Sequence, residues 1–96
     1  MNKPKEIDIN TVVIQNKNLD STDLDGEKVM MNIDRGKYYG LNEVGSRIWE
    51  LLEEPKQVSG LISTLLEEYD VDRSTCESSV LAFLSKLYDE ELIEIV

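Results

Sequence analysis

The sequence predicts an α+β domain with a winged helix-turn-helix-like architecture, in which a three-stranded antiparallel sheet precedes a three-helix bundle. Three observations predict this fold class. Residues 11–41 contain short β-branched or aromatic runs separated by turn-forming residues, which is typical of strands. Residues 42–96 instead place apolar side chains three and four positions apart, as helices do. Asn42 stands between the two halves, and asparagine is a frequent helix N-cap.

The three expected strands follow one another along the first half of the chain. Residues 11–15 (Thr-Val-Val-Ile-Gln) form a compact β-branched run of strand length. Residues 16–26 are rich in Asn, Asp, Ser and Thr and end in an Asp-Gly turn dipeptide, so we expect them to form a loop. Residues 27–33 would form the second strand, residues 34–36 a tight turn, and residues 37–41 the third strand. These strands would pair as one antiparallel sheet.

The helix that follows Asn42 is expected to be short and amphipathic. Its apolar residues repeat at i, i+4, i+7 and i+8, namely Val44, Ile48, Leu51 and Leu52. It carries the only tryptophan of the chain, Trp49, and Pro55 ends it.

Two further helices and an apolar tail complete the predicted fold. The second helix is expected at about residues 58–69 and the third at about residues 73–88, with Asp72 as the N-cap of the third. Residues 92–96 are strand-like and could pack on the bundle or pair with the sheet. Residues 1–10 are polar and are expected to form a flexible arm. Residues 11–96 would then make up the single domain.

The charge of the chain is strongly acidic and unevenly distributed. The net charge is −10, and residues 42–96 alone carry four basic and 13 acidic groups. Such a half repels nucleic acid and anionic lipid, and it attracts basic peptide or protein surfaces. The alternative is that the charge only keeps a small domain soluble.

The sequence favours a cytoplasmic protein. It has no apolar run of the roughly 18–20 residues that cross a bilayer. The first residues, Met-Asn-Lys-Pro-Lys-Glu, are not followed by the apolar stretch of a signal peptide. A single cysteine excludes an internal disulfide framework, as is common in a reducing compartment.

The residue types predict neither an enzyme nor a metal or cofactor site. The chain has no histidine, which removes the commonest general base and metal ligand. Cys76 lies on the apolar stripe of the third helix, where a buried structural thiol is far more common than a nucleophile. The paired glutamates of the helical half lie near helix ends, which usually face solvent. We therefore expect a binding protein that needs no cofactor.

A winged-helix DNA-binding regulator or adaptor is the alternative function. The helices expected at about 58–69 and 73–88 have suitable lengths for a helix-turn-helix unit. A recognition helix needs cations for phosphates and donors for base edges, yet this one offers only Arg73 near its start and Lys86 near its end. The architecture agrees with DNA binding, but the charge opposes it.

One stretch carries a resemblance to a known family. Residues 36–52 read Gly-Lys-Tyr-Tyr-Gly-Leu-Asn-Glu-Val-Gly-Ser-Arg-Ile-Trp-Glu-Leu-Leu, and residues 65–72 read Leu-Leu-Glu-Glu-Tyr-Asp-Val-Asp. With the apolar residues at 80–84, 87 and 92–93, this pattern resembles the PqqD family over about residues 11–96. Its members are the precursor peptide recognition elements of ribosomally made, modified peptides (RiPPs). Glu91 departs from the glycine that the family usually has before the Leu-Ile pair, so we expect the end of the third helix to be built differently. Gln57 departs from the serine or threonine that usually caps the second helix of the family.

The resemblance implies a function and its partners. Family members bind the leader segment of a precursor peptide and deliver it to a companion processing enzyme. A separate small acidic protein looks most like the lasso-peptide type, whose companion is a leader peptidase. Other pathways that use this fold pair it with a radical SAM enzyme.

The resemblance also implies a site, in which the leader becomes an added strand beside residues 37–41, against the third helix. An unpaired edge strand is a template for such addition. The peptide-binding residues expected on this basis are Lys37, Tyr38, Tyr39, Gly40 and Leu41 on the strand, and Cys76, Glu77, Val80, Leu81 and Leu84 on the helix.

The apolar arc of the third helix supports that site from the residues themselves. It spans nearly half of the helix circumference at about 100° per residue, which is wide for one neighbour. Part of it should therefore remain for a ligand. The equally open alternative is that Val80 and Leu84 belong only to the core. Glu77 could pair with a basic leader side chain, although exposed helical glutamates are common.

Overall fold

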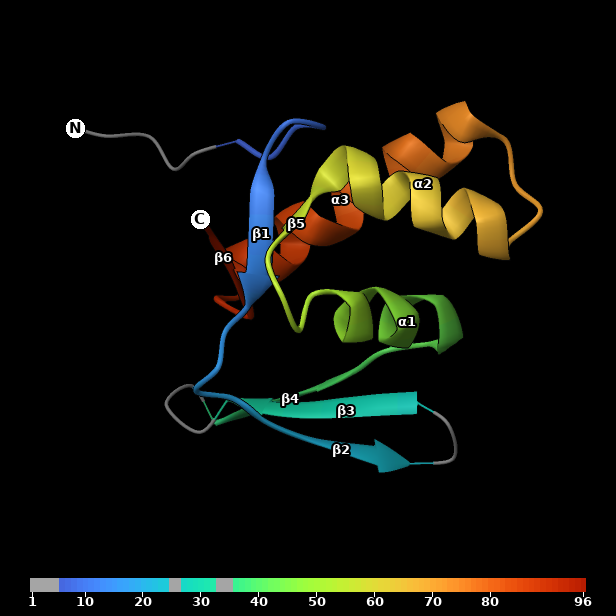
Figure 1. The fold of residues 1–96 in the computed structure, drawn as a ribbon. Coiled ribbons are helices and arrows are strands. Elements are labelled where there is room, and N and C mark those ends of the chain that lie inside the picture. The colour runs from blue at the N-terminus through green and yellow to red at the C-terminus, as the bar shows by residue number, and fades with distance from the viewer. Residues whose placement is uncertain (1–5, 25–26, 33–35) are drawn as a thin grey trace.

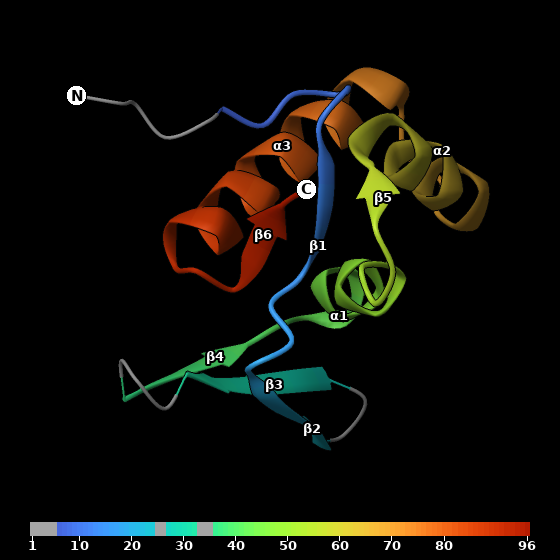
Figure 2. The same cartoon turned by 60° about the vertical axis from the view of Figure 1, so that its left-hand side comes forward.

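The computed structural model describes residues 6–24, 27–32 and 36–96, and it has an α+β fold (Figure 1). The fold class is confirmed: a three-stranded antiparallel sheet and three helices are present among the described residues. The elements in chain order are β1 (Val12–Gln15), β2 (Asp20–Leu24), β3 (Glu27–Asn32), β4 (Lys37–Gly40), α1 (Glu43–Leu51), β5 (Lys56–Gln57), α2 (Val58–Glu68), α3 (Arg73–Asp89) and β6 (Ile93–Ile95). In both ribbon views α1 lies between the β2–β3–β4 sheet and the other two helices (Figures 1 and 2).

The predicted membership of the three-stranded sheet is wrong. Its order is β2–β3–β4, and β2 comes from the polar segment that we expected to be a loop. β2 pairs along its whole length with β3, from Asp20 opposite Met31 to Leu24 opposite Glu27. Pairing with a neighbour thus overrides the low strand propensity of this segment, as is common in sheets. The turns predicted at 25–26 and 34–36 fall largely outside the described residues.

The first predicted strand, β1, belongs to a second small sheet of order β5–β1–β6. Val13 at its centre is fully buried. β6 is the predicted apolar tail, and it pairs antiparallel with β1 so that Ile95 lies opposite Val13. β1 therefore lies between the short strand that precedes α2 and the strand that follows α3, instead of extending the first sheet (Figure 2).

A hydrogen-bonded junction connects the β2–β3–β4 sheet to α1. Asn42 is the N-cap of α1, as predicted, and its side chain accepts from the amide of Gly45 at 2.8 Å. The hydroxyl of Ser46 donates to the carbonyl of Leu41 at 3.2 Å and accepts from the amide of Lys28 at 2.9 Å. Ser46 is buried, so its hydroxyl satisfies strand groups that water cannot reach.

The other two helices begin as the sequence predicts. Asp72 caps α3 by accepting from the amide of Thr75 at 2.8 Å, and this hydrogen bond lowers the pKa of the Asp72 carboxyl. Gln57 precedes α2 without a side-chain cap. The guanidinium of Arg47 on α1 donates to both carboxylate oxygens of Glu68 at 2.8 and 2.7 Å, which holds α1 against the end of α2 and lowers the pKa of Glu68.

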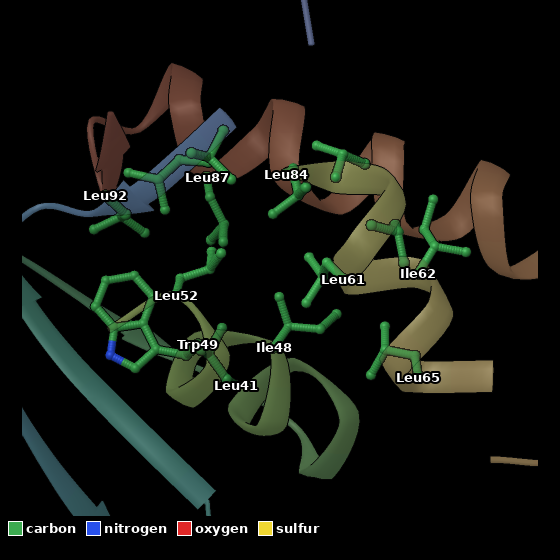
Figure 3. Close-up of a cluster of buried hydrophobic side chains, with 14 of the residues drawn as sticks. Leu41, Ile48, Trp49, Leu52, Leu61, Ile62, Leu65, Leu84, Leu87 and Leu92 are labelled. Carbon is green, nitrogen blue, oxygen red and sulfur yellow. The ribbon is translucent and has the colours of Figure 1, made fainter. Parts of the chain in front are cut away.

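The hydrophobic core lies where the three helices meet β6 and the inner face of the sheet (Figure 3). Ile48, Trp49 and Leu52 enter it from α1 or directly after it, and all three are at most 3% exposed. The remaining members include Leu61, Ile62 and Leu65 of α2, Leu84 and Leu87 of α3, Met30 of β3, and Leu92 between α3 and β6. Burial of this apolar surface is the main term that stabilises such a domain.

Residues 6–10, which we expected to belong to a loose arm, contact the domain. Asp8 Oδ1 accepts from the amide of Asn10 at 2.8 Å, and the carbonyl of Ile9 accepts from the amide of Ser59 at 2.9 Å. Ile7 is half-buried against the core. This part of the segment is therefore held at the start of α2.

The end of α3 is a Schellman motif with Glu91 at the position that glycine usually takes. The amide of Leu92 donates to the carbonyl of Leu87 at 2.8 Å, and that of Glu91 donates to Tyr88 at 3.0 Å. Glu91 has a φ of +62°, so an L-residue adopts the left-handed region here. The glutamate thus keeps the ordinary helix end, and the expectation of a differently built one is wrong.

This geometry predicts a stability difference between two variants of Glu91. Both Glu91→Gly and Glu91→Ala lose the glutamate side chain, but only alanine keeps a Cβ in the left-handed region. We expect Glu91→Gly to be more stable than Glu91→Ala by about 1 kcal/mol in urea unfolding. Equal unfolding midpoints at equal m-values would show that the left-handed conformation is absent in solution.

Candidate peptide-binding site

β4 is an edge strand of the β2–β3–β4 sheet, and its backbone has an open side. The amide of Leu41 donates to the carbonyl of Lys28 at 2.9 Å, and Tyr39 lies opposite Met30 in the same register. Bonded and non-bonded pairs alternate in antiparallel ladders. The N–H and C=O groups of Tyr39 therefore point toward β3, and those of Tyr38 and Gly40 point toward the open edge.

The side chains of β4 divide between two faces of the sheet. Tyr39 is half-buried on the inner face, opposite the fully buried Met30. Tyr38 is 72% exposed on the outer face. Gly40 also faces outward, and a Cβ built on it would have no atom within 4 Å. The open edge is therefore flanked by space on the outer face and by α3 on the inner side.

β4 and α3 run in opposite directions along each other. Glu90, directly after α3, accepts a hydrogen bond from the Tyr39 hydroxyl at 2.7 Å and lies 3.7 Å from the ammonium of Lys37. At the other end, a Cβ built on Gly45 would lie only 3.1 Å from the ring of Phe83 and 3.4 Å from Leu41. The start of β4 thus meets the end of α3, and the residues after β4 meet its middle.

These contacts fix which side of α3 faces β4. Residues three or four positions apart share one side of a helix, so Ser79, Phe83, Lys86 and Glu90 form what we call the near flank. Glu77, Leu81 and Tyr88 project from the opposite side at about 100° per residue, and we call them the far flank. Two of the predicted peptide-binding residues, Glu77 and Leu81, therefore lie on the flank that faces away from β4.

A cavity of about 320 Å³ opens beyond the end of β4. Its lining comes from the start of α1, the end of α2, the loop after α2 and the first half of α3. The lining residues are Asn42, Val44, Ile48, Leu65, Tyr69, Val71, Cys76, Ser79, Val80 and Phe83. Most of them are apolar, and Val44 and Val71 remain about two-fifths exposed at 41% and 39%. The cavity can therefore hold an apolar side chain and has few groups to bind a charged one.

The other three predicted helix residues lie on the buried side of α3. Cys76 and Val80 are buried and line the cavity. Leu84 is fully buried and belongs to the core. The expected site did not include Ser79, Phe83 or Val44, which line the cavity. A single serine carries no pattern of its own, and the apolar repeat that contains Val44 indicates only that one side of α1 is buried. The helical spacing of Ser79 and Phe83 was visible, but nothing in the sequence indicated that this side of the helix faces the strand.

The one thiol that lines the cavity belongs to Cys76. Burial raises the pKa of the Cys76 thiol, which keeps it in the unreactive protonated form. In the part of the chain that the structure describes, no three Cys, Asp or Glu side chains are grouped as metal ligands would be. Within the same described ranges, no helix is both long and apolar enough to span a membrane.

Comparisons with known proteins show which family and which fold the chain resembles. The family model described as coenzyme PQQ synthesis protein D (PqqD) matches residues 27–93. A solved structure, "TbiB1 in Complex with the TbiA(beta) Leader Peptide", is similar over 84% of this chain and 94% of that chain, with 40% sequence identity and a TM-score of 0.77. No curated protein matches the chain. The matched residues 27–93 include β3, β4 and all three helices, so they contain the whole candidate site.

Proposed function

Because the chain belongs to the PqqD family, we propose that it is a non-catalytic RiPP recognition element that captures the leader segment of a precursor peptide. The leader would add to β4 as a new strand, and the protein would then present it to a companion processing enzyme. The observation behind this proposal is that the N–H and C=O groups of Tyr38 and Gly40 point toward the open edge of β4. The complex of the similar protein TbiB1 with a leader peptide supports it.

The proposed binding mode divides affinity and specificity between backbone and side chains. Pairing with Tyr38 and Gly40 would supply hydrogen bonds that any extended peptide can make. Alternate leader side chains would point toward the near flank of α3, and one apolar side chain would enter the cavity beside Ser79 and Phe83. The proposed site thus keeps residues 37–41, Cys76 and Val80, and it adds Ser79 and Phe83. It no longer includes Glu77 and Leu81, and Leu84 supports it from the core.

We propose the leader peptidase of lasso peptide biosynthesis as the companion enzyme, acting in the cytoplasm. The family resemblance and the small acidic form of the chain support this choice. A radical SAM enzyme, as in other pathways of this family, would be the companion if the gene neighbourhood encodes one. Genes for a short precursor, a transglutaminase-like protease and an asparagine-synthetase-like cyclase beside this gene would support the lasso assignment.

DNA binding is disfavoured by the surface that a recognition helix would need. The exposed residues in the first turns of α3 are mainly Arg73, Ser74, Thr75, Ser78 and Ser79, with one cation among them. Residues 42–96 carry a net charge of −9. Bringing them to a duplex would cost electrostatic free energy, whereas DNA-binding domains gain it by releasing counterions.

A substitution series in the leader tests the proposed function. The probe is a synthetic leader taken from the precursor that is encoded next to this gene. We expect proline at the central leader positions to weaken binding at least about 100-fold, because each proline removes a donor from the ladder and its ring obstructs pairing. Alanine should weaken binding only at alternate positions, whose side chains face α3. Fluorescence anisotropy with a labelled leader measures both sets.

Two results would contradict this function. Proline and alanine could have equal effects at every position, which would indicate a leader bound without strand pairing. Alternatively, the leader could bind as a helix, with circular dichroism showing a gain in helical signal on mixing. Either result would leave the family assignment intact and overturn the proposed binding mode.

A further inference from the structure

A second open strand edge lies on the other side of α3. β6 is the outer strand of the β5–β1–β6 sheet. The amide of Val96 donates to the carbonyl of Val12 and that of Asn16 to Leu92, both at 2.9 Å. Because bonded pairs alternate along the ladder, the backbone groups of Ile93 and Ile95 point away from β1. β6 therefore offers the same kind of template as β4.

A cleft of about 660 Å³ lies beside this edge. Tyr88 and Asp89 line it from the end of α3, and Ile93 and Ile95 line it from β6. Tyr88 belongs to the far flank of α3, so the cleft and the candidate leader site lie along opposite sides of one helix. A strand added to β6 would contact the far flank as a leader on β4 would contact the near flank.

The charged side chains around the cleft favour a basic ligand over an acidic one. Asp89, Glu91 and Glu94 line it, and none of its described lining residues is a lysine or arginine. A second copy of this chain paired through β6 would bring these carboxylates together, and nucleic acid or anionic lipid would be repelled in the same way. A basic segment would instead gain attraction from the carboxylates of Asp89 and Glu94.

We propose that the β6 edge binds a basic, extended segment of the companion processing enzyme. This inference rests on the proposed function, because it names the docking surface for the partner of the leader-binding protein. β6 presents Ile93 and Ile95 on one face and Glu94 on the other, so the segment should alternate apolar and basic residues. Since the two sites lie on opposite flanks of α3, the enzyme segment and the leader would bind at the same time.

The test uses a model peptide and amide chemical shifts of the full chain. The probe is an acetylated, amidated peptide that alternates lysine and valine over seven residues, titrated at about 50 mM salt, where charge attraction is only partly screened. We expect saturable shifts in Ile93–Ile95 and around Tyr88, with Lys37–Gly40 unchanged. Prior saturation with leader should change the affinity for the probe by less than about twofold.

Reversing acidic charges at the cleft, or away from it, distinguishes attraction of the probe to the cleft from attraction to the net charge of the protein. The double variant Asp89→Lys with Glu94→Lys should weaken probe binding at least about tenfold. The control, Glu54→Lys with Glu67→Lys, changes the net charge equally at two exposed sites away from the cleft and should weaken it less than about threefold. Equal losses in the two variants, or probe shifts confined to Lys37–Gly40, would overturn the inference.

Leader titration of the same samples keeps this inference distinct from the proposed function. If the leader binds but the probe leaves Ile93–Ile95 unshifted, the β6 docking inference is wrong and the proposed function stands. If the probe shifts β6 but no leader binds, the proposed function is wrong, and with it the assignment of the β6 partner to a leader-processing enzyme.

Discussion

Replacing Gly40 by proline is expected to weaken leader binding by about 10- to 100-fold, which corresponds to about 1.4–2.8 kcal/mol. The amide of Gly40 points to the open edge, so proline removes one donor to the added strand and leaves a leader carbonyl without its partner. The proline ring also occupies the line along which the leader approaches. No hydrogen bond between β4 and β3 is lost, and proline is tolerated at such positions of edge strands.

Gly40→Ala is the matched control. A Cβ at this position has no atom within 4 Å, and Gly40 does not adopt a positive φ, so alanine should fit without strain. It keeps the outward amide, and we expect its leader affinity to stay within about twofold of the parent chain. Thermal unfolding of both variants checks that the sheet remains intact. Equal leader affinities of a folded Gly40→Pro variant and of Gly40→Ala would contradict strand addition at this edge.

Replacing Ser79 by tyrosine is the second change with a large expected effect. Ser79 is exposed at the mouth of the cavity, together with Asn42 and Val44. A tyrosine ring there would fill the space that we assign to an apolar leader side chain. We expect at least about tenfold weaker leader binding by fluorescence anisotropy, because burying one such side chain contributes about 1.5–3 kcal/mol.

Ser78→Tyr provides the control on the same helix. Ser78 is exposed, lies one position earlier and projects about 100° away from Ser79, outside the cavity lining. Tyrosine there changes helix propensity and size in the same way, and we expect leader affinity to change less than about twofold. Equal losses in both variants would indicate a general effect on α3, and an unchanged affinity of Ser79→Tyr would show that the leader does not use the cavity.

Local sequence signals predicted the helical half well. The caps at Asn42 and Asp72 depend on one side chain and the amide three positions later, so residue type and spacing are sufficient. The apolar periodicity placed α2 and α3 within one residue of their observed bounds, whereas α1 ends at Leu51, four residues before the proline that was expected to end it. The resemblance to the PqqD family, which rested largely on residues 36–52, is confirmed by the family match.

The pairing of the strands could not be predicted in the same way. β2 is a polar segment, Asp-Ser-Thr-Asp-Leu, that becomes a strand only because β3 lies beside it. β1 looked like the first strand of the main sheet because it comes first and is β-branched. Its partners, β5 and β6, are two and three residues long, and they lie more than 40 positions away in the sequence. Such long-range pairs have no local signature.

The sequence also did not allow us to predict which side of α3 faces β4. Its apolar arc showed that one side is buried, but not which edge of that arc faces β4. The choice is made by contacts between distant residues, namely Tyr39 with Glu90 and Gly45 with Phe83. For that reason Leu81 and Glu77 were expected beside β4, whereas Ser79 and Phe83 lie on the side of α3 that faces it.

Amide hydrogen exchange at β4 tests the central claim most directly. In the free protein the amide of Leu41 is already bonded to Lys28, whereas those of Tyr38 and Gly40 face the open edge. On saturation with leader, we predict slowed exchange at Tyr38 and Gly40, with protection at Leu41 unchanged or raised slightly. If Tyr38 and Gly40 exchange as fast in the complex as in the free protein while α1, α2 or β6 becomes protected, the leader does not add to β4.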